Sequence, residues 1–137
     1  MKKVYFAGSI TGGRDDADTY KLIIEKLKEK FIVLTEHIGN EQMSEMGEYN
    51  LSDTEIYTRD VAWIRESDFI FAEVTHLSLG VGYEIGYAEA HGKKILCFVN
   101  GTKVNRLSAM LTGNSNVECH VYYDIQEVYD FIDKLEI

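Results

Sequence analysis

The chain of 137 residues contains no proline and only two cysteines. Without proline, no helix interior is interrupted by its ring, so we expect unbroken helices. Cys97 and Cys119 fall in apolar, strand-like segments and have neither the spacing of a disulfide framework nor that of a metal site. We therefore expect two reduced, buried thiols, no metal and a cytoplasmic protein.

Long hydrophobic runs and clusters of basic residues are missing as well. The longest apolar stretches have the length of a strand, and no charged-then-apolar leader opens the sequence, so we expect neither a membrane span nor a secretory signal. The 14 Lys and Arg are scattered and are outnumbered by 23 Asp and Glu, giving a net charge of −9. This charge balance argues against a nucleic acid polymer as partner. Any phosphate group must then be bound by local groups.

Apolar strand patterns and helical patterns alternate along the whole chain. Strands are predicted at 3–7, 31–35, 69–74, 94–99 and 118–122, and helices at 15–30, 53–67, 81–91, 106–111 and 125–135. Repeated βα units of this kind predict one α/β domain spanning 1–137, with a small, doubly wound parallel sheet between layers of helices. Glycines cluster after the first and third predicted strands, where open parallel sheets bind their ligands.

The most informative segment is Ser-Leu-Gly-Val-Gly-Tyr-Glu at 78–84. It follows a strand buried on both faces and leads into a helix predicted to begin at Val81, so Glu84 is expected in the first helical turn. Backbone N–H groups there favour an ionised carboxylate, and Gly80 and Gly82 let a ligand approach the main chain. The alternative is a surface glutamate that only interacts with the helix dipole.

A second acid stands on an apolar helix face. Ile56, Asp60 and Ile64 recur at a spacing of four, and a buried aspartate needs a partner, so Asp60 is either a structural hydrogen-bond acceptor or a site residue. Paired with Glu84, it suits glycosidic bond cleavage, in which one carboxylate attacks the sugar carbon and the other handles a proton. The two carboxyl groups should then approach within about 5 to 6 Å. Tyr5, in the first strand, would orient Glu84 if its hydroxyl points to the carboxyl edge of the sheet.

The loop after the first strand is a candidate for binding a polar ligand. It consists of Gly8, Ser9, Ile10, Thr11, Gly12, Gly13 and Arg14. Its spacing is neither a dinucleotide fingerprint nor a P-loop, and an ordinary tight turn is the alternative. His37, at the end of the second strand, is expected near the site. The polar segment 39–51 is either a mobile lid or a plain surface connection.

Five separated motifs carry a family resemblance. They are VYFAGSI at 4–10, LTEH at 34–37, AEVT at 72–75, SLGVGYEIG at 78–86 and LSAM at 107–110. In these motifs the chain resembles the 2′-deoxynucleoside 5′-phosphate N-hydrolases, relatives of the nucleoside 2-deoxyribosyltransferases. The resemblance implies a flavodoxin-like homodimer that hydrolyses the N-glycosidic bond of deoxynucleoside monophosphates without a metal or cofactor.

The resemblance also implies roles for individual residues. Glu84 matches the nucleophile that attacks C1′ and forms a covalent 5-phosphodeoxyribosyl enzyme, which water then resolves. Asp60 matches the acid that protonates the departing base, and Tyr5 matches the tyrosine that holds the nucleophile. The matched substrate-binding positions are loop 8–14, His37, Ser78, Gly80 and, reaching the phosphate from the other subunit, Ser108, Ala109 and Met110.

Two serines favour a phosphorylated substrate. The transferases are similar but carry aspartate where Ser78 stands and asparagine where Ser108 stands. An aspartate suits a free 5′-hydroxyl and would repel a phosphate dianion, whereas serine donates a hydrogen bond without adding negative charge. In a different respect the chain departs from the mammalian members, which resemble it but have arginine where Thr11 stands.

Three other functions are alternatives to hydrolysis. A deoxyribosyltransferase would share the nucleophile and pass the sugar to a second base. A signalling receiver domain shares the βα alternation, but the positions of its acids and its lysine are taken by loop 8–13, Glu73 and Tyr123, which disfavours it. A protein that binds nucleotides without cleaving them is the third.

Overall fold

The computed structural model describes residues 1–10, 13–37 and 51–137, with the side chains of residues 13–15 left undescribed. In these ranges, five parallel strands form one sheet in the order β2-β1-β3-β4-β5. The strands are β1 (Lys3–Ala7), β2 (Ile32–Leu34), β3 (Phe69–Glu73), β4 (Lys94–Asn100) and β5 (Val117–Tyr122). The predicted doubly wound α/β fold is confirmed.

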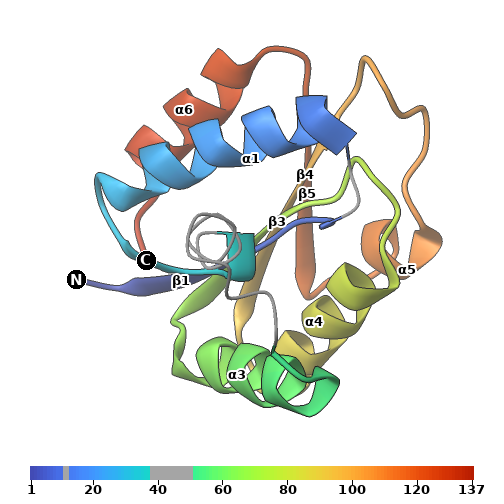
Figure 1. Ribbon diagram of the computed structural model, residues 1–137. Coiled ribbons are helices and arrows are strands. Elements are labelled where there is room, and N and C mark those ends of the chain that lie inside the picture. Colours follow the sequence, from blue (N-terminus) through green and yellow to red (C-terminus); the bar gives the residue numbers. More distant parts are fainter. Residues whose placement is uncertain (11–12, 38–50) are drawn as a thin grey trace.

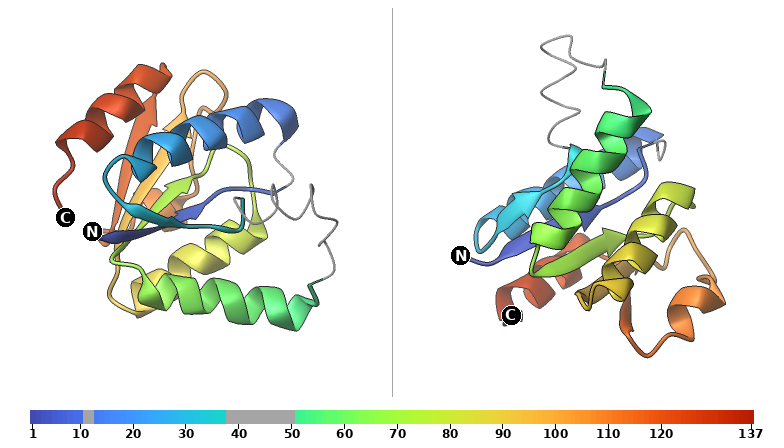
Figure 2. Two further views of the ribbon diagram at one scale, coloured as in Figure 1. Left: turned by 60° about the vertical axis from the view of Figure 1, so that its left-hand side comes forward. Right: turned by 90° about the horizontal axis from the view of Figure 1, so that it is seen from below.

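Helices cover both faces of the sheet. They are α1 (Gly13–Lys28), α3 (Asp53–Glu66), α4 (Leu79–Ala90), α5 (Ala109–Thr112) and α6 (Ile125–Lys134). Figure 1 shows α1 and α6 side by side over one face and α3 and α4 across the other, and both views of Figure 2 show the same two layers. Among the described residues, no helix has the length and apolarity needed to cross a membrane.

Successive side chains of a strand point to opposite faces of the sheet, so the hydrophobic core has two halves, one on each face. On β1, Val4 and Phe6 pack under α1 and α6, whereas Tyr5 and Ala7 face α3 and α4. All five residues of β3 are buried, as expected for a central parallel strand covered on both faces. The last residue of this strand is a buried carboxylate, Glu73.

Helix boundaries differ from the predicted ones by a few residues, and one difference matters for the site. Helix α4 begins at Leu79 rather than at Val81, because the Ser78 hydroxyl accepts a hydrogen bond from the backbone N–H of Val81 and caps the helix earlier. Glu84 therefore lies in the second helical turn. The expectation that it sits among the free N–H groups of the first turn was wrong.

The strand order places a crevice between β1 and β3. From β1 the chain leads through α1 to β2 at one edge, and from β3 it leads through α4 towards β4 and β5. Since α1 and α4 lie on opposite faces, the loops after β1 and β3 diverge at the carboxyl edge of the sheet. Ligands of open parallel sheets bind at this kind of switch point.

Candidate active site

Four polar side chains converge at the switch point from four separate parts of the chain. Tyr5 comes from β1, Glu36 from the segment directly after β2, Asp60 from α3 and Glu84 from α4. Carboxylate oxygens of Glu36, Asp60 and Glu84 all lie within 4.8 Å of one another. The approach of Asp60 to Glu84 thus agrees with the close separation expected from sequence.

A groove of about 260 Å³ opens onto two of these carboxylates. Its walls come from α3 and the first two turns of α4. The lining residues are Asp53, Ile56, Tyr57, Asp60, Val61, Gly80, Tyr83 and Glu84. Apolar and aromatic walls around a few convergent polar groups are typical of a small-molecule site. At Gly80, an added Cβ would meet only the Ser78 hydroxyl, at 3.8 Å, so this glycine leaves the backbone open to a ligand.

Glu84 accepts a hydrogen bond from the Tyr5 hydroxyl, as predicted for that tyrosine. Burial raises the pKa of Glu84 to about 7, Asp60 adds to the increase, and the Tyr5 hydrogen bond and Arg59 oppose it. Burial, with the Glu84 and Asp60 charges, also raises the pKa of Tyr5, so its hydroxyl remains a donor. The environment of Glu84 is therefore a balance of burial against one strong hydrogen bond, and not the helix dipole that the sequence suggested.

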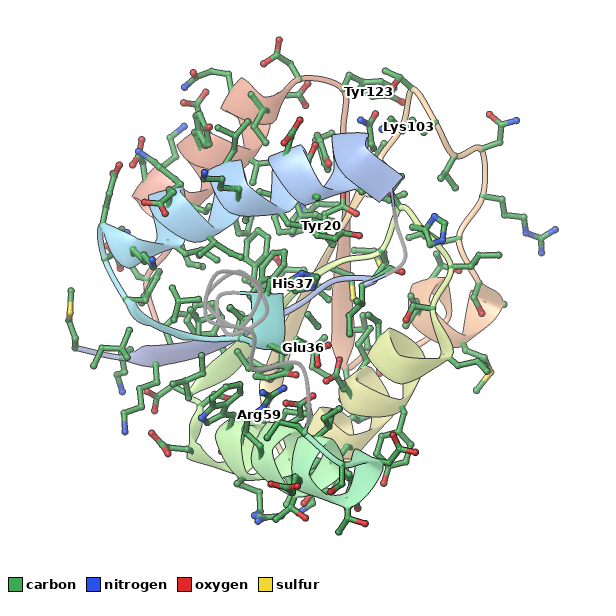
Figure 3. All side chains as sticks on the ribbon, in the orientation of Figure 1. Tyr20, Glu36, His37, Arg59, Lys103 and Tyr123 are labelled. Atoms are coloured by element: carbon green, nitrogen blue, oxygen red, sulfur yellow. The ribbon has the colours of Figure 1, made fainter. Side chains whose placement is uncertain are left out.

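Asp60 lies on the buried stripe of α3, as its spacing predicted. It is 7% exposed, beside the fully buried Ile64, and its carboxylate accepts a hydrogen bond from Arg59 Nε at 2.9 Å. Arg59 also reaches Glu36 at 3.5 Å, and its guanidinium lies over the Trp63 ring at 4.8 Å. In Figure 3, Arg59 rises from α3 towards Glu36. One cation thus bridges two of the three acids.

Glu36 is the member of the cluster that the sequence reasoning missed. It is 9% exposed, and a carboxylate oxygen lies within 4.8 Å of one of Asp60. Burial raises the pKa of Glu36 to about 8, and the neighbouring Asp60 adds to this, while Arg59 opposes it. The raised pKa favours the protonated form of Glu36 near neutral pH. Its place directly after a strand, at the carboxyl edge, was the available signal.

Three converging carboxylates are also an arrangement that a divalent cation can use, because Mg²⁺ and Ca²⁺ take carboxylate oxygens as ligands. In the described residues, however, the Arg59 guanidinium already bonds two of the three acids, and the raised pKa of Glu36 favours a bound proton. Such a cluster is equally suited to proton transfer. The expected absence of a metal stays a prediction.

Two aromatic side chains, His37 and Tyr20, make hydrogen bonds to the backbone of the loop after β1. His37 Nε2 donates to the Gly8 carbonyl at 2.8 Å, and the buried Ser9 donates its N–H to the Tyr20 hydroxyl at 3.1 Å. A Cβ at Gly8 would approach the Tyr20 ring within 3.0 Å, which explains the glycine. Burial lowers the pKa of His37, so its ring is neutral and acts as a hydrogen-bond donor to this loop.

The remaining loop residues are placed only in part. Ile10 is 60% exposed, and Gly13 begins α1. Thr11 and Gly12, the side chain of Arg14 and the segment 38–50, which holds nearly all of the lid candidate, lie outside the described residues.

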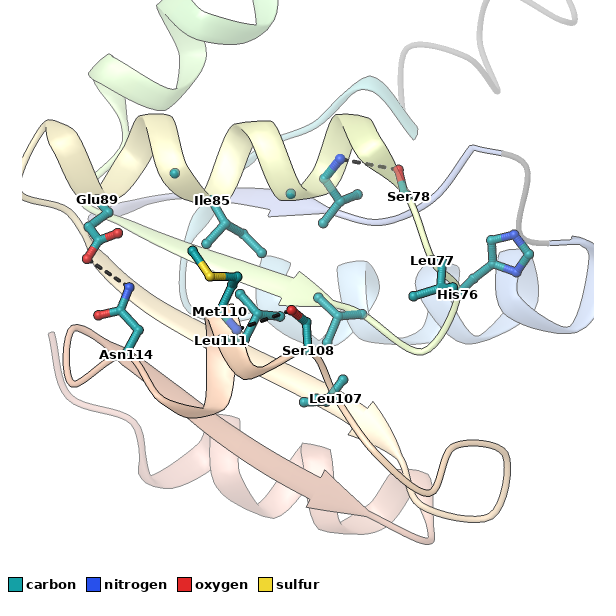
Figure 4. A pocket seen from close by; sticks show the side chains of 14 residues that line it. His76, Leu77, Ser78, Ile85, Glu89, Leu107, Ser108, Met110, Leu111 and Asn114 are labelled. Carbon is teal, nitrogen blue, oxygen red and sulfur yellow. Dashed lines mark hydrogen bonds between the residues drawn. The ribbon is translucent and has the colours of Figure 1, made fainter.

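Ser78 and Ser108 line a second groove, of about 290 Å³ (Figure 4). The α4 residues that line it differ from those of the Glu84 groove and lie on the opposite flank of the helix. The Ser78 oxygen accepts the N–H of Val81 at 3.2 Å, which leaves its hydroxyl hydrogen for another acceptor. Ser108 likewise caps α5 by accepting the N–H of Met110 at 3.2 Å. Ala109 and Met110 are exposed, the latter to 80%. Residues 108–110 thus lie together on this flank and do not reach the Glu84 groove of their own chain.

Fold and site together define a class: a small, doubly wound α/β protein with a carboxylate cluster at its switch point. The family model described as nucleoside 2-deoxyribosyltransferase matches residues 4–121. The 5-hydroxymethyl-dUMP N-hydrolase of Tetraodon nigroviridis is 48% identical over 123 residues, covering 89% of this chain and 87% of the relative. That of Mus musculus is 43% identical over 125 residues, covering 90% and 72%. This chain belongs to the nucleoside 2-deoxyribosyltransferase family, and the resemblance seen in its motifs is confirmed.

The comparison with solved structures supports the same fold. A CMP N-glycosidase from Clostridium botulinum superimposes with a TM-score of 0.72, covering 98% of this chain and all of the other, at 24% sequence identity. A 2-desoxiribosyltransferase from Leishmania mexicana gives a TM-score of 0.64 at 18% identity, covering 99% of this chain and 100% of the other. At these identities the likeness is one of fold.

Proposed function

We propose that this chain hydrolyses the N-glycosidic bond of 2′-deoxynucleoside 5′-monophosphates to free base and 2-deoxyribose 5-phosphate. The observation that carries the proposal is the grouping of Tyr5, Asp60 and Glu84, with a nucleophile candidate and an acid candidate within 4.8 Å of each other at one groove. The names of the relatives, 5-hydroxymethyl-dUMP N-hydrolases, support the same reaction.

In the first step, an oxygen of Glu84 attacks C1′ of the deoxyribose, and the C1′–N bond breaks with its electron pair going to the base. The Tyr5 hydrogen bond offsets part of the burial that raises the pKa of Glu84, and so keeps a reactive anion accessible near neutral pH. The short separation from Asp60 supports direct attack and a covalent glutamyl ester, as in retaining glycosidases.

The leaving base needs a proton, and the pair of Glu36 and Asp60 supplies it. Glu36, whose pKa is raised, holds the proton, and Asp60, which lies within 4.8 Å of it and lines the groove, passes the proton to the base. In the second step the deprotonated pair takes a proton from water, whose oxygen attacks C1′. The ester bond to Glu84 breaks, and 2-deoxyribose 5-phosphate leaves.

Ser78 and the start of α4 are proposed to receive the 5′-phosphate. A negative charge at this position would repel a phosphate dianion. The Ser78 hydroxyl and the backbone at Gly80 present neutral donors instead. Loop 8–14 and His37 are proposed to enclose the nucleotide from the other side of the crevice.

We further infer a homodimer, with Ser108, Ala109 and Met110 completing the neighbouring site, and a cytoplasmic location. Large exposed apolar side chains support an interface there, since Leu77 and Met110, which line the second groove, are 89% and 80% exposed. Leu79, next to Ser78 in the sequence, is 97% exposed. Two unpaired cysteines, Cys97 and Cys119, support a reducing compartment.

The test is to incubate the protein with deoxynucleoside 5′-monophosphates, including that of 5-hydroxymethyluracil, and to measure the released base by chromatography. Glu84→Gln should lower turnover by at least about a thousandfold, whereas Glu66→Gln, at the exposed end of α3, should keep it. Brief incubation of the wild type should give a protein whose mass is increased by one deoxyribose phosphate. Turnover by Glu84→Gln at the wild-type rate would overturn the assignment, and transfer of the sugar to an added base would indicate a transferase.

A further inference from the structure

Glu73, the last residue of β3, is a buried carboxylate that the proposed reaction does not use. It is 2% exposed and lies on the α1 and α6 face of the sheet, opposite the face of Tyr5 and Glu84. Burying an ionised carboxylate costs free energy, and burial accordingly raises the pKa of Glu73. The groups that Glu73 hydrogen-bonds should therefore explain why a carboxylate stands at this position.

Three hydrogen bonds to Glu73 come from two residues. The Tyr122 hydroxyl donates to Oε2 from β5, two strands away. Thr75 donates its backbone N–H to Oε1 at 2.8 Å and its hydroxyl to Oε2 at 2.7 Å. Thr75 therefore binds both carboxylate oxygens and is held in one orientation.

The same threonine fastens the turn after β3 to the end of β4. Its Oγ1 accepts the backbone N–H of Asn100 at 2.9 Å, and the neighbouring Val74 donates its N–H to the Phe98 carbonyl at 2.8 Å. The Thr75 side chain is thus hydrogen-bonded to Glu73 of β3 and to Asn100 of β4. These two bonds fix the turn at Thr75.

Among the described residues, few contacts hold the chain between Thr75 and the start of α4. His76 and Leu77 are exposed, Leu77 to 89%, and the nearest charged partner of His76 is Asp16 at 3.9 Å. Ser78, three residues after Thr75, then caps α4. The position of Ser78 relative to the sheet consequently depends on where Thr75 is fixed, together with the packing of α4 through Val81 and Ile85.

We propose that Glu73 and Thr75 form a positioning clamp that fixes the Ser78 end of α4 for the 5′-phosphate and so sets the preference for nucleotides over nucleosides. The inference rests on the proposed function, in which Ser78 meets the phosphate. Neither residue touches the substrate. They act through the turn, which carries the Ser78 hydroxyl and the first N–H groups of α4 to one place.

Two variants separate this role from a structural one. Thr75→Val and Tyr122→Phe each remove one hydroxyl that bonds the same oxygen of Glu73, so each deprives the same buried carboxylate of one donor. Only the first releases the turn. We expect Thr75→Val to raise the KM of the best deoxynucleoside 5′-monophosphate about tenfold, with kcat nearly unchanged.

The inhibition constant of the matching nucleoside should not change, because it has no phosphate. Thr75→Ser, which keeps the hydroxyl, should restore the wild-type KM, and Tyr122→Phe should leave the ratio of the two constants as it is. Thr75 is only partly buried, so Thr75→Ala serves as a second variant if Thr75→Val unfolds. Thermal unfolding of every variant checks the fold.

The clamp is overturned if Thr75→Val and Tyr122→Phe change the ratio equally, or if Thr75→Val weakens nucleotide and nucleoside alike. If the proposed function is wrong, the result differs, because the wild-type protein then releases no base. In that case, the dissociation constants of the same nucleotide and nucleoside, measured by calorimetry on the same variants, still decide whether the clamp exists.

Discussion

The hydroxyl of Tyr5 donates a hydrogen bond to the carboxylate of Glu84, which lies 79 residues further along the chain. The bond joins a central strand to the second turn of α4, and it opposes the burial that raises the pKa of Glu84. A tyrosine in this position orients the carboxylate and favours its anion with the same contact.

Replacing Tyr5 with phenylalanine should therefore weaken the nucleophile. Without the hydrogen bond, the pKa of Glu84 rises further above 7, and a smaller fraction of the enzyme is ionised at neutral pH. We expect kcat/KM at pH 7 to fall about ten- to a hundredfold and to recover in part at higher pH. Tyr129→Phe, on α6, is the control, and a pH profile of Tyr5→Phe that coincides with that of the wild type would contradict the assignment.

The wild-type pH profile follows from two carboxyl groups with separate tasks. Glu84, with a pKa of about 7, must be ionised to attack, and Glu36, with a pKa of about 8, must keep its proton for the leaving base. The logarithm of kcat/KM should rise with pH up to about pH 7 and fall above about pH 8, which gives a narrow bell-shaped profile. Glu36→Gln should lower kcat by about a hundredfold and remove the alkaline limb. An unchanged alkaline limb in that variant would move the acid role away from Glu36.

The prediction of this site from sequence succeeded where a residue's own neighbours define its environment. Ile56 and Ile64, four residues away on either side, were enough to place Asp60 on a buried helix face. A buried strand followed by glycines was enough to place Glu84 at the carboxyl edge. The alternation of strands and helices gave the α/β class, with all five strands near their predicted positions.

Glu36 was missed because its environment depends on strand order. Only the pairing of β2 with β1 brings the end of β2 next to α3, and no local periodicity encodes that pairing. The start of α4 was misplaced for a different reason. Glycine at position 80 disfavours a helix by about 1 kcal/mol, but the Ser78 cap and the burial of Val81 and Ile85 outweigh this cost, so the helix starts two residues earlier than predicted.

Titration of Glu36 should also make the free energy of unfolding depend on pH. Its folded-state pKa of about 8 lies above the ordinary value of 4.5, so between these values the folded chain binds more protons than the unfolded one. The free energy of unfolding then falls as pH rises through this window. Glu36→Gln cannot ionise, so its stability relative to the wild type should increase by about 1 to 3 kcal/mol between pH 5 and pH 9. Urea unfolding at several pH values measures this, and a constant difference would mean that Glu36 is not titrating in that window.

Ser78 offers a substitution that separates helix capping from substrate charge. Aspartate caps helices as well as serine does, so Ser78→Asp should keep the stability of α4, whereas Ser78→Ala should lose about 1 kcal/mol with the bond to the Val81 N–H. For the substrate the order reverses. Alanine only removes a donor, but aspartate adds a negative charge where the phosphate dianion is proposed to bind. Ser78→Asp should thus raise the KM of a nucleotide by a hundredfold or so, more than Ser78→Ala does, and leave nucleoside binding nearly unchanged. If the aspartate variant binds the nucleotide as well as the wild type does, the phosphate lies elsewhere than at the start of α4.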